Sequence, residues 1–291
     1  MDIPRASIIV PVYNGQATLE DCIKSLLKIK YDKDKLEIIV VDNCSTDSTK
    51  DILERYQSEI IILKEVKKGA SAARNKGIMK ATGEVLAFTD VDCVVDKDWL
   101  KNLTIRAMEE KVGIVGGRIL ALNSKNIIAK AGEKIHDHRR AFSDDIPHAI
   151  SMNWASRKEV LIEVGLFDED FLRSQDTDLS LRIFAAGYKF VYSENAIIYH
   201  KNSDTYRDLF YKGYLGGLYA TKLYKKHSLF YKKRGVENNK LKRFISLVIY
   251  IKEILKNETL RDSVFIIIHY IGRVCGLAIG SFRFMHAKIG Y

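Results

Sequence analysis

The first 120 residues alternate short apolar runs with helical patterns, and this alternation constrains the fold more than any other feature of the sequence. Four runs rich in β-branched residues stand out, at 7–12, 37–41, 60–66 and 85–89. Between the first two runs, apolar residues recur at helical spacing over 19–27. Such alternation is typical of βαβ units. The sequence therefore predicts an α/β domain with a mostly parallel central sheet flanked by helices.

The later part of the chain changes character twice. Residues 113–122 and 149–155 predict two further strands, and 176–186 predicts a helix that Gly187 ends. Beyond residue 205 the pattern is helical in three stretches, at 206–226, 241–256 and 262–285. We therefore divide the chain into an α/β domain at 1–205 and a C-terminal helical extension at 206–291.

Polar residues follow the predicted strands where ligands bind in such sheets, at the carboxyl ends. Tyr13 follows the first strand, Asp42 the second, and Asp90 and Asp92 the fourth. On an extended backbone Asp90 and Asp92 would point the same way and offer two oxygen ligands to Mg²⁺ or Mn²⁺. The alternative is a solvated strand end or a cap of the helix predicted at 97–110.

Five segments occur in an order that carries a family resemblance. They are PVYNGQATL at 11–19, VVDNCSTDST at 40–49, GASAARNKGIMKATGEVLAFTDVDC at 69–93, FDEDFLRSQDTDLSLRIFAAGYKFVY at 167–192 and IIYH at 197–200. Together they resemble family 2 glycosyltransferases with the GT-A fold. The resemblance covers roughly the first 205 residues. It implies inverting transfer of a sugar from a nucleotide diphosphate donor, for which we expect a UDP-sugar, to a hydroxyl of the acceptor.

The resemblance assigns the nucleotide to residues near the first two strands. It implies that Pro11 and Tyr13 line the base pocket and that Asp42 accepts a hydrogen bond from the imide N–H of uracil. The residue types agree, since Tyr13 offers a face for stacking and Asp42 an acceptor. Ordinary packing of Tyr13 and helix capping by Asp42 are the alternatives.

The segment at 69–93 would hold the diphosphate and the cation. Gly69 lies at the expected start of a helix whose free N–H groups, with Arg74, could face a diphosphate. The resemblance implies that Arg74 contacts the nucleotide, whereas an ordinary helix would leave Arg74 solvated. It also implies that Asp92 binds the metal directly and that Asp90 lies closer to the ribose or a metal-bound water.

His200 follows an apolar segment and resembles a histidine that completes the metal shell in some relatives. Imidazole binds Mn²⁺ acceptably and Mg²⁺ less well, so the expected cofactor is one of these two cations. The alternative is an ordinary hydrogen-bonded histidine at a strand end.

The helix predicted at 176–186 begins with residues that resemble the Glu-Asp-X-Asp segment of the family. In inverting transfer one carboxylate must take the proton of the acceptor hydroxyl, and we assign that role to Asp176. Gln175 stands where relatives usually have Glu, which leaves the orientation of the acceptor open. For Asp178 we favour an ion pair with Arg182 four residues later on the same helix.

Asn153 and Trp154 fall in a segment resembling the strand that borders the sugar and acceptor pockets. The face of Trp154 would pack against a sugar ring. Packing in the core is an equal alternative.

The net charge of +10 is distributed unevenly. Residues 1–205 carry 30 basic and 32 acidic side chains, and 206–291 carry 17 and 5. Within 206–234 lysines alternate with Tyr and Phe, which suits a helix at a lipid headgroup layer. The extension therefore predicts an anionic membrane surface as partner, and we expect the protein on the inner face of the cell membrane.

The apolar segment at 264–282 is nearly long enough to span a bilayer, but it carries His269 and Arg273 near its middle. Gly272, Gly276 and Gly280 form a row against which another helix could pack closely. We favour a helical hairpin that lies in the membrane plane or is shallowly inserted, with its small face against protein. A true span and a soluble helical subdomain or homo-oligomer interface remain alternatives.

Other functions are weighed against the transferase. A lipid-linked or glycan acceptor fits a membrane address, whereas a decayed site marked by Gln175 would make the chain a non-catalytic sugar-nucleotide or membrane scaffold. A dinucleotide-dependent oxidoreductase would need a glycine-rich fingerprint after the first strand, and none is present. Nucleic-acid binding through the basic tail is not expected. The four cysteines have no metal-type spacing, and the N-terminus lacks the pattern of a signal peptide, which favours a cytoplasmic body.

Overall fold

The computed structural model describes residues 3–122, 133, 136–144, 147–202, 205–234 and 260–285. These residues form two compact units, which we call the sheet unit, up to Lys201, and the helical unit, from Asn202 onward. The helix predicted at 241–256 lies outside the described residues. The functional division at residue 205 stays a prediction.

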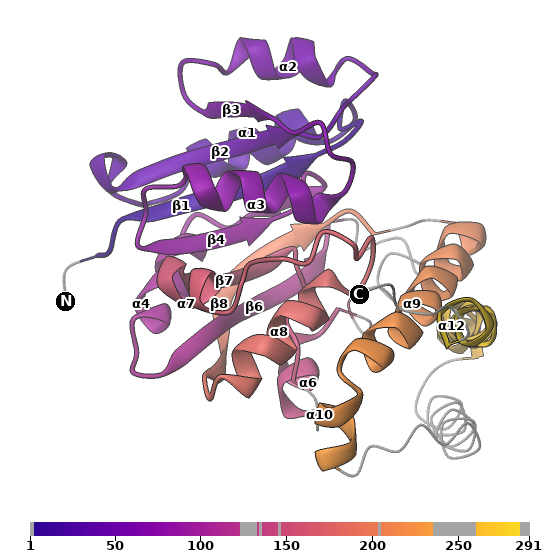
Figure 1. Cartoon of the computed structure of the whole chain (residues 1–291). Coiled ribbons are helices and arrows are strands. Elements are labelled where there is room, and N and C mark those ends of the chain that lie inside the picture. The colour runs from indigo at the N-terminus through magenta and orange to yellow at the C-terminus, as the bar shows by residue number, and fades with distance from the viewer. Residues whose placement is uncertain are drawn as a thin grey trace. The chain divides into compact units, whose positions relative to one another are not determined.

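The sheet unit is built on one eight-stranded sheet with the order β3-β2-β1-β4-β7-β6-β8-β5 (Figure 1). The strands are β1 (Ala6–Val12), β2 (Leu36–Asp42), β3 (Ile61–Lys64), β4 (Val85–Thr89), β5 (Cys93–Val95), β6 (Val112–Ala121), β7 (Asn153–Arg157) and β8 (Lys189–His200). β3, β2, β1 and β4 are parallel neighbours. β7 runs antiparallel to both β4 and β6, and β5 runs antiparallel to β8.

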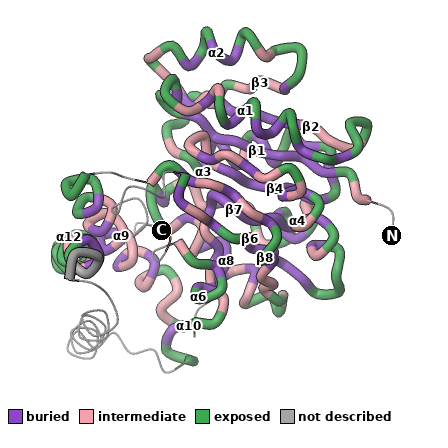
Figure 2. The backbone as a smooth tube through the Cα atoms, turned by 180° about the vertical axis from the view of Figure 1, so that it is seen from behind, coloured by how far each residue is buried: buried purple, intermediate pink, exposed green. Residues whose placement is uncertain are grey.

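Helices cover both faces of this sheet, which explains why β1, β2 and β4 are mostly apolar and buried. Alternate residues of β1 belong to different cores: Ile8 and Val10 to one, Ile9 to the other, each 0% exposed. The first core also contains residues of α1 (Leu19–Leu27), α2 (Thr49–Arg55) and α4 (Trp99–Ala107). The second contains residues of α3 (Ala70–Lys80), α7 (Lys158–Glu163) and α8 (Gln175–Ala185). Figure 2 shows the buried strands between these helices.

The predicted α/β organisation is confirmed, and its errors lie mainly in the later strands. The strand predicted at 149–155 begins only at Asn153 in β7, and the strand predicted at 60–66 ends at Lys64. The sequence reasoning also missed β5 and two short helices, α6 (His138–Ser143) and α7, as well as the 3-10 turn η1 (Lys33–Lys35). Such short elements present too few residues for a clear period.

Asn153 and Trp154 are core residues, which corrects the prediction that they border the sugar pocket. Asn153 is 0% exposed; its Oδ1 accepts a hydrogen bond from Trp99 Nε1 at 2.7 Å. Its Nδ2 donates to the backbone oxygens of Arg118 at 2.8 Å and Ala196 at 3.1 Å. Trp154 is 1% exposed and stacks on Phe88 with ring centroids 4.5 Å apart. The core-packing alternative therefore applies to both side chains.

The helical unit contains α9 (Tyr206–Lys226), α10 (Ser228–Lys233) and α12 (Leu260–Met285). The backbones of α9 and α12 approach each other closely at glycines. A Cβ atom on Gly213 would collide with the carbonyl of His269, and one on Gly217 with that of Arg273. The predicted glycine row faces α9 in the same way: Gly272, Gly276 and Gly280 approach the backbone of Phe210, Tyr214 and Leu218. Because partner numbers rise together, the two helices are parallel.

This packing agrees with the expectation that the small face of 264–282 lies against protein, and it leaves the predicted hairpin untested. The glycine row contacts α9 of the same chain, so the row is used within the chain and is not free for a second copy. The shorter apolar segment expected as the other arm of the hairpin lies within the undescribed stretch 235–259.

Replacing Asn153 tests whether it is a structural residue. In Asn153→Ala the indole N–H of Trp99 and two backbone carbonyls lose their buried partner, which we expect to lower the free energy of unfolding by about 3 kcal/mol. Urea unfolding followed by tryptophan fluorescence measures this change. The exposed Asn195→Ala on β8 is the matched control, with an expected change within about 0.5 kcal/mol. Equal stability of the two variants would contradict the structural role.

Candidate active site

Tyr13 and Asp42 lie at the carboxyl ends of neighbouring strands, because Val12 of β1 pairs with Asp42 of β2. Tyr13 is 57% exposed, so its ring is available for stacking, whereas Pro11 is buried within β1. Oδ1 of Asp42 accepts a hydrogen bond from the backbone N–H of Ser45 at 3.1 Å and closes a local turn. Since α2 begins only at residue 49, Asp42 shapes the loop and does not cap the helix.

The loops after β1 and β2 are joined by side-chain hydrogen bonds. Oδ1 of Asn14 accepts from the backbone N–H of Thr46 at 2.8 Å, and Asp47 Oδ2 accepts from that of Gln16 at 3.1 Å. The backbone N–H of Gly15 donates to Thr49 Oγ1 at 2.8 Å. These bonds hold the Tyr13 and Asp42 loops together. The sequence reasoning missed them, although the density of Asn, Asp, Ser and Thr at 42–49 is a signal for such turns.

Helix α3 is preceded by an N-cap glycine, Gly69, whose backbone conformation other residues adopt rarely. Gly69 has φ of +130°, and its N–H donates to Oδ1 of Asn43 at 2.7 Å. This bond ties the start of α3 to the loop after β2. The helix N-terminus is therefore anchored to the carboxyl end of the sheet.

Arg74 on α3 is 2% exposed, so the alternative of a solvated helix face is wrong. Nη2 of Arg74 lies 2.6 Å from Oδ1 of Asp90, and the guanidinium lies 5.7 Å from the ring centroid of Phe167. Nε and Nη1 have no hydrogen-bond partner among the described residues. A buried guanidinium with two unpaired nitrogens is costly, and an anionic ligand would satisfy their N–H groups.

Asp90 and Asp92 occupy a turn, and this corrects the expectation that they share one face of a strand. β4 ends at Thr89, and the backbone N–H of Cys93 donates to the carbonyl of Asp90 at 3.1 Å. The turn sends the carboxylates to different partners. Asp90 pairs with Arg74, and Asp92 Oδ2 lies 3.3 Å from Nε2 of His200.

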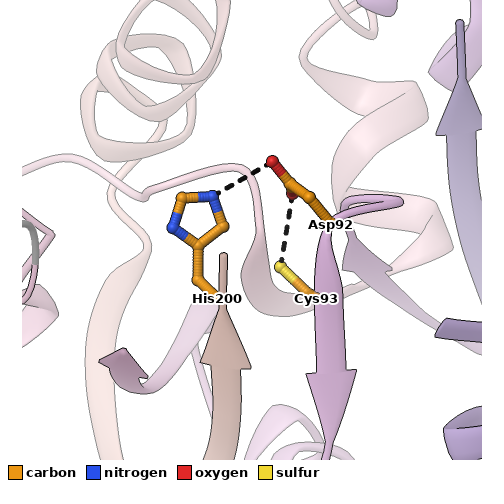
Figure 3. Close-up of side chains that lie close together, drawn as sticks. All are labelled: Asp92, Cys93 and His200. Carbon is orange, nitrogen blue, oxygen red and sulfur yellow. Dashed lines mark hydrogen bonds and ion pairs between the residues drawn. The ribbon is translucent and has the colours of Figure 1, made fainter. Parts of the chain in front are cut away.

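Strand pairing brings the three groups drawn in Figure 3 together, because Cys93 of β5 is the register partner of His200 on β8. Ligand atoms of Asp92, Cys93 and His200 all lie within 4.8 Å of one another. Burial, with smaller effects from Asp92 and Asp90, raises the pKa of Cys93 well above its usual value, so its sulfur is a neutral thiol at pH 7. The carboxylate of Asp92 and the imidazole of His200 are therefore the better ligands for a hard cation.

Asp176 lies in the first turn of α8, half-buried, with both carboxylate oxygens hydrogen-bonded. Oδ2 accepts from the hydroxyl of Ser151 at 2.9 Å and from its backbone N–H at 3.2 Å, and Oδ1 accepts from the backbone N–H of Thr177 at 2.8 Å. Asp178 is fully buried and pairs with Arg182 at 2.7 Å, which confirms the ion pair predicted for it. Gln175 is 9% exposed, and its Oε1 has no partner among the described residues.

His138 is a buried histidine that the sequence reasoning missed. It is 1% exposed; its Nδ1 lies 2.9 Å from the carbonyl oxygen of Gly117, and its Nε2 lies 2.8 Å from the backbone N of Ile150. Only the neutral tautomer with hydrogen on Nδ1 donates to the carbonyl and accepts from the amide. Burial lowers the pKa of His138 to about 4. A histidine within a mostly polar segment gave no pattern from which this role could be predicted.

Comparison with known proteins identifies the family. Residues 7–165 match the model of glycosyl transferase family 2. The chain belongs to this family. Among its relatives, glycosyltransferase AglE of Haloferax volcanii is 28% identical over 68% of this chain and 67% of AglE. Probable glycosyltransferase YdaM of Bacillus subtilis is 27% identical over 71% of this chain, but only 53% of YdaM is covered.

Solved structures show that the fold is of the GT-A type, as the sequence predicted. Mannosyltransferase PcManGT from Pyrobaculum calidifontis, in complex with GDP-Man and Mn²⁺, superposes with a TM-score of 0.70 at 18% identity, covering 99% of this chain and 89% of that chain. S. aureus TarS 1-349 in complex with UDP-GlcNAc gives 0.57 at 17% identity, covering 96% and 91%.

The pH dependence of stability tests whether His138 is buried in its neutral form. The unfolded chain takes up this proton near pH 6.5 and the folded chain only near pH 4, so stability is lost as the pH falls between these values. We expect the free energy of unfolding of wild type, relative to His138→Gln, to fall by up to about 3 kcal/mol over this window. Urea unfolding followed by tryptophan fluorescence reports on the sheet unit, since both tryptophans, Trp99 and Trp154, lie in it. A difference independent of pH would contradict a buried neutral His138.

Proposed function

We propose that this chain is a metal-dependent, inverting glycosyltransferase that uses a nucleotide diphosphate sugar. The observation that supports it most is the buried Arg74, which pairs with Asp90 and has two nitrogens, Nε and Nη1, without a partner among the described residues. Asp92 and His200 supply a second set of polar atoms. Asp92 lies two residues after Asp90, and His200 pairs in register with Cys93, the residue after Asp92. Membership of glycosyl transferase family 2 supports the same chemistry.

The donor in this proposal is a UDP-sugar. The exposed ring of Tyr13 stacks on the base, above the buried Pro11, while Asp42 accepts the imide N–H of uracil. The diphosphate takes the free N–H groups of Arg74 and those at the start of α3, which Gly69 opens. The relatives bind different donors, GDP-Man in PcManGT and UDP-GlcNAc in TarS, so experiments on this chain should include both nucleotides.

The residues present fit a divalent cation. Asp92 offers a half-exposed carboxylate and His200 a buried imidazole, and these are ligands that Mn²⁺ accepts readily and Mg²⁺ less so. Asp90 is tied to Arg74 and lies closer to the nucleotide in this proposal. A bound cation would offset the negative charge that develops on the departing diphosphate.

Asp176 is the base in this proposal. The oxygen of the acceptor hydroxyl forms a bond to the anomeric carbon while the bond from that carbon to the diphosphate oxygen breaks. Asp176 takes the hydroxyl proton, and the nucleoside diphosphate leaves with the bonding electron pair, so that the configuration inverts. The half-buried carboxylate keeps access for the acceptor, and Ser151 and Thr177 hold its orientation.

Gln175 contacts the acceptor in this proposal. Its Oε1 is buried without a partner among the described residues and can accept a hydrogen bond from a sugar or acceptor hydroxyl. An amide at this position makes that contact without a second negative charge beside Asp176.

Removing the proposed base gives the primary test. In Asp176→Asn we expect release of nucleoside diphosphate from UDP-GlcNAc and GDP-mannose, assayed with Mn²⁺, to fall by at least about 100-fold. We expect EDTA to silence the wild type. Asp51→Asn, an exposed carboxylate in the first turn of α2, is the matched control and should keep full activity. Full activity of Asp176→Asn would contradict the assignment of Asp176 as the base. Inactivity of the wild type towards all nucleotide sugars would favour a non-catalytic scaffold.

The second part of the proposal is a membrane address for the helical unit, on the cytoplasmic face, with a lipid-linked or glycan acceptor. Within α12, Val264–Phe284 is long and apolar enough to span a bilayer, which by itself is weak evidence. Outside its glycine row, α12 exposes large apolar side chains, Ile271 at 51%, Ile279 at 50% and Phe282 at 80%. The net charge of residues 206–291 is +12, which favours binding to a surface of anionic lipid.

Vesicle binding tests this address. The full chain should float with vesicles that contain phosphatidylserine and bind less to phosphatidylcholine alone. Ile279→Glu should lower vesicle binding by roughly 10-fold, because a charge is placed on the apolar face. Ile162→Glu, at a 52% exposed isoleucine of α7, is the matched control and should bind as wild type does. Equal loss in both variants, or binding to RNA instead of vesicles at the same salt, would contradict the membrane address.

A further inference from the structure

Three consecutive backbone amides preceding β7 each donate to a side chain from another element. The N–H of Ala149 donates to Ser180 Oγ at 2.9 Å, and that of Ile150 to His138 Nε2 at 2.8 Å. The N–H of Ser151 donates to Asp176 Oδ2 at 3.2 Å. We propose that His138 and Ser151 are positioning residues for the carboxylate of Asp176. This inference rests on the proposed function, in which Asp176 is the base.

The segment at 149–151 holds Asp176 through both its side chain and its backbone. The hydroxyl of Ser151 donates to Oδ2 of Asp176 at 2.9 Å, alongside its own N–H. The hydroxyl of Ser180, which accepts from Ala149, donates in turn to the carbonyl of Asp176 at 2.6 Å. Any shift of this segment therefore moves the hydrogen bonds that orient the carboxylate.

His138 fixes the middle of that segment to the central sheet. The ring lies between the carbonyl of Gly117 on β6 and the N–H of Ile150. Gly116 leaves room for it, since a Cβ there would lie 2.7 Å from Cγ of His138. The imidazole is thus a rigid spacer that sets the distance between β6 and the backbone next to Ser151.

The segment depends on these bonds because it belongs to no strand. Residues 147–152 precede β7 and have no ladder partner, so side chains hold the amides of 149–151 where a sheet would otherwise do so. Displacing a base by about 1 Å can lower turnover by about 100-fold without loss of substrate binding. His138 and Ser151 should therefore affect kcat more than donor affinity.

Two substitutions of His138 separate positioning from packing. His138→Phe keeps a ring of similar size but removes both hydrogen bonds, whereas His138→Gln retains one donor and one acceptor. With UDP-GlcNAc or GDP-mannose and Mn²⁺, we expect His138→Phe to lower kcat by roughly 10-fold to 100-fold with an unchanged KM for the donor. His138→Gln should recover most of kcat. Ser151→Ala should lower kcat by several-fold, with KM again unchanged.

A structural measurement accompanies the kinetics. Hydrogen exchange followed by mass spectrometry should show faster exchange of the amides at 149–151 in His138→Phe, with that of Ala155 in β7 unchanged. In an Asp176→Asn background, His138→Phe and Ser151→Ala should cause no further loss of turnover, because they act through the same carboxylate.

The outcomes distinguish this inference from the proposed function. If Asp176→Asn keeps full activity, the proposed function is wrong and the inference with it. If Asp176→Asn is inactive while His138→Phe and Ser151→Ala keep wild-type kcat, the inference alone is wrong. A loss in His138→Phe that raises KM in parallel, or that His138→Gln does not recover, indicates general packing and also overturns it.

Discussion

The parallel pairing of β1 with β2 and β4 is the constraint on which the rest of the site depends. It places the carboxyl ends of these strands at the same edge of the sheet, where Asp42 ends β2 and Tyr13 and Asp90 follow β1 and β4. The apolar residues that bury both faces of these strands leave no choice of register, since a slip of one residue would exchange the two cores. The polar residues of the site therefore owe their positions to buried residues that never meet a ligand.

At this edge of the sheet, two buried side chains, Arg74 and His200, each contact one carboxylate. Arg74 forms an ion pair with Asp90, and the pairing of β5 with β8 brings the imidazole of His200 to Asp92. Each carboxylate of the Asp-X-Asp segment thus has its own partner, the Arg74 guanidinium for Asp90 and the His200 imidazole for Asp92. Among the described residues the hydrogen-bond donors to the Asp176 carboxylate are neutral, which suits the proton-accepting role that we propose for it.

The sequence predicted the strands and motifs of the first half of the sheet well, because their patterns are local. Val85–Thr89 was predicted to the residue, and the order of motifs led to the correct family. Contacts between distant segments could not be predicted. The burial of Asn153 depends on Trp99, Arg118 and Ala196, and the role of His138 depends on a segment without any period. The parallel packing of α9 on α12 could not be predicted either, because a row of glycines does not indicate which helix packs against it.

The most direct test of the account is whether nucleotide binding depends on a cation held by Asp92. Isothermal titration of the wild type with UDP and with GDP, each with and without Mn²⁺, measures this. We predict that Mn²⁺ tightens binding of one nucleoside diphosphate by at least about 10-fold and that Asp92→Ala abolishes this gain. Equal affinity with and without Mn²⁺, or an undiminished gain in Asp92→Ala, would contradict the account.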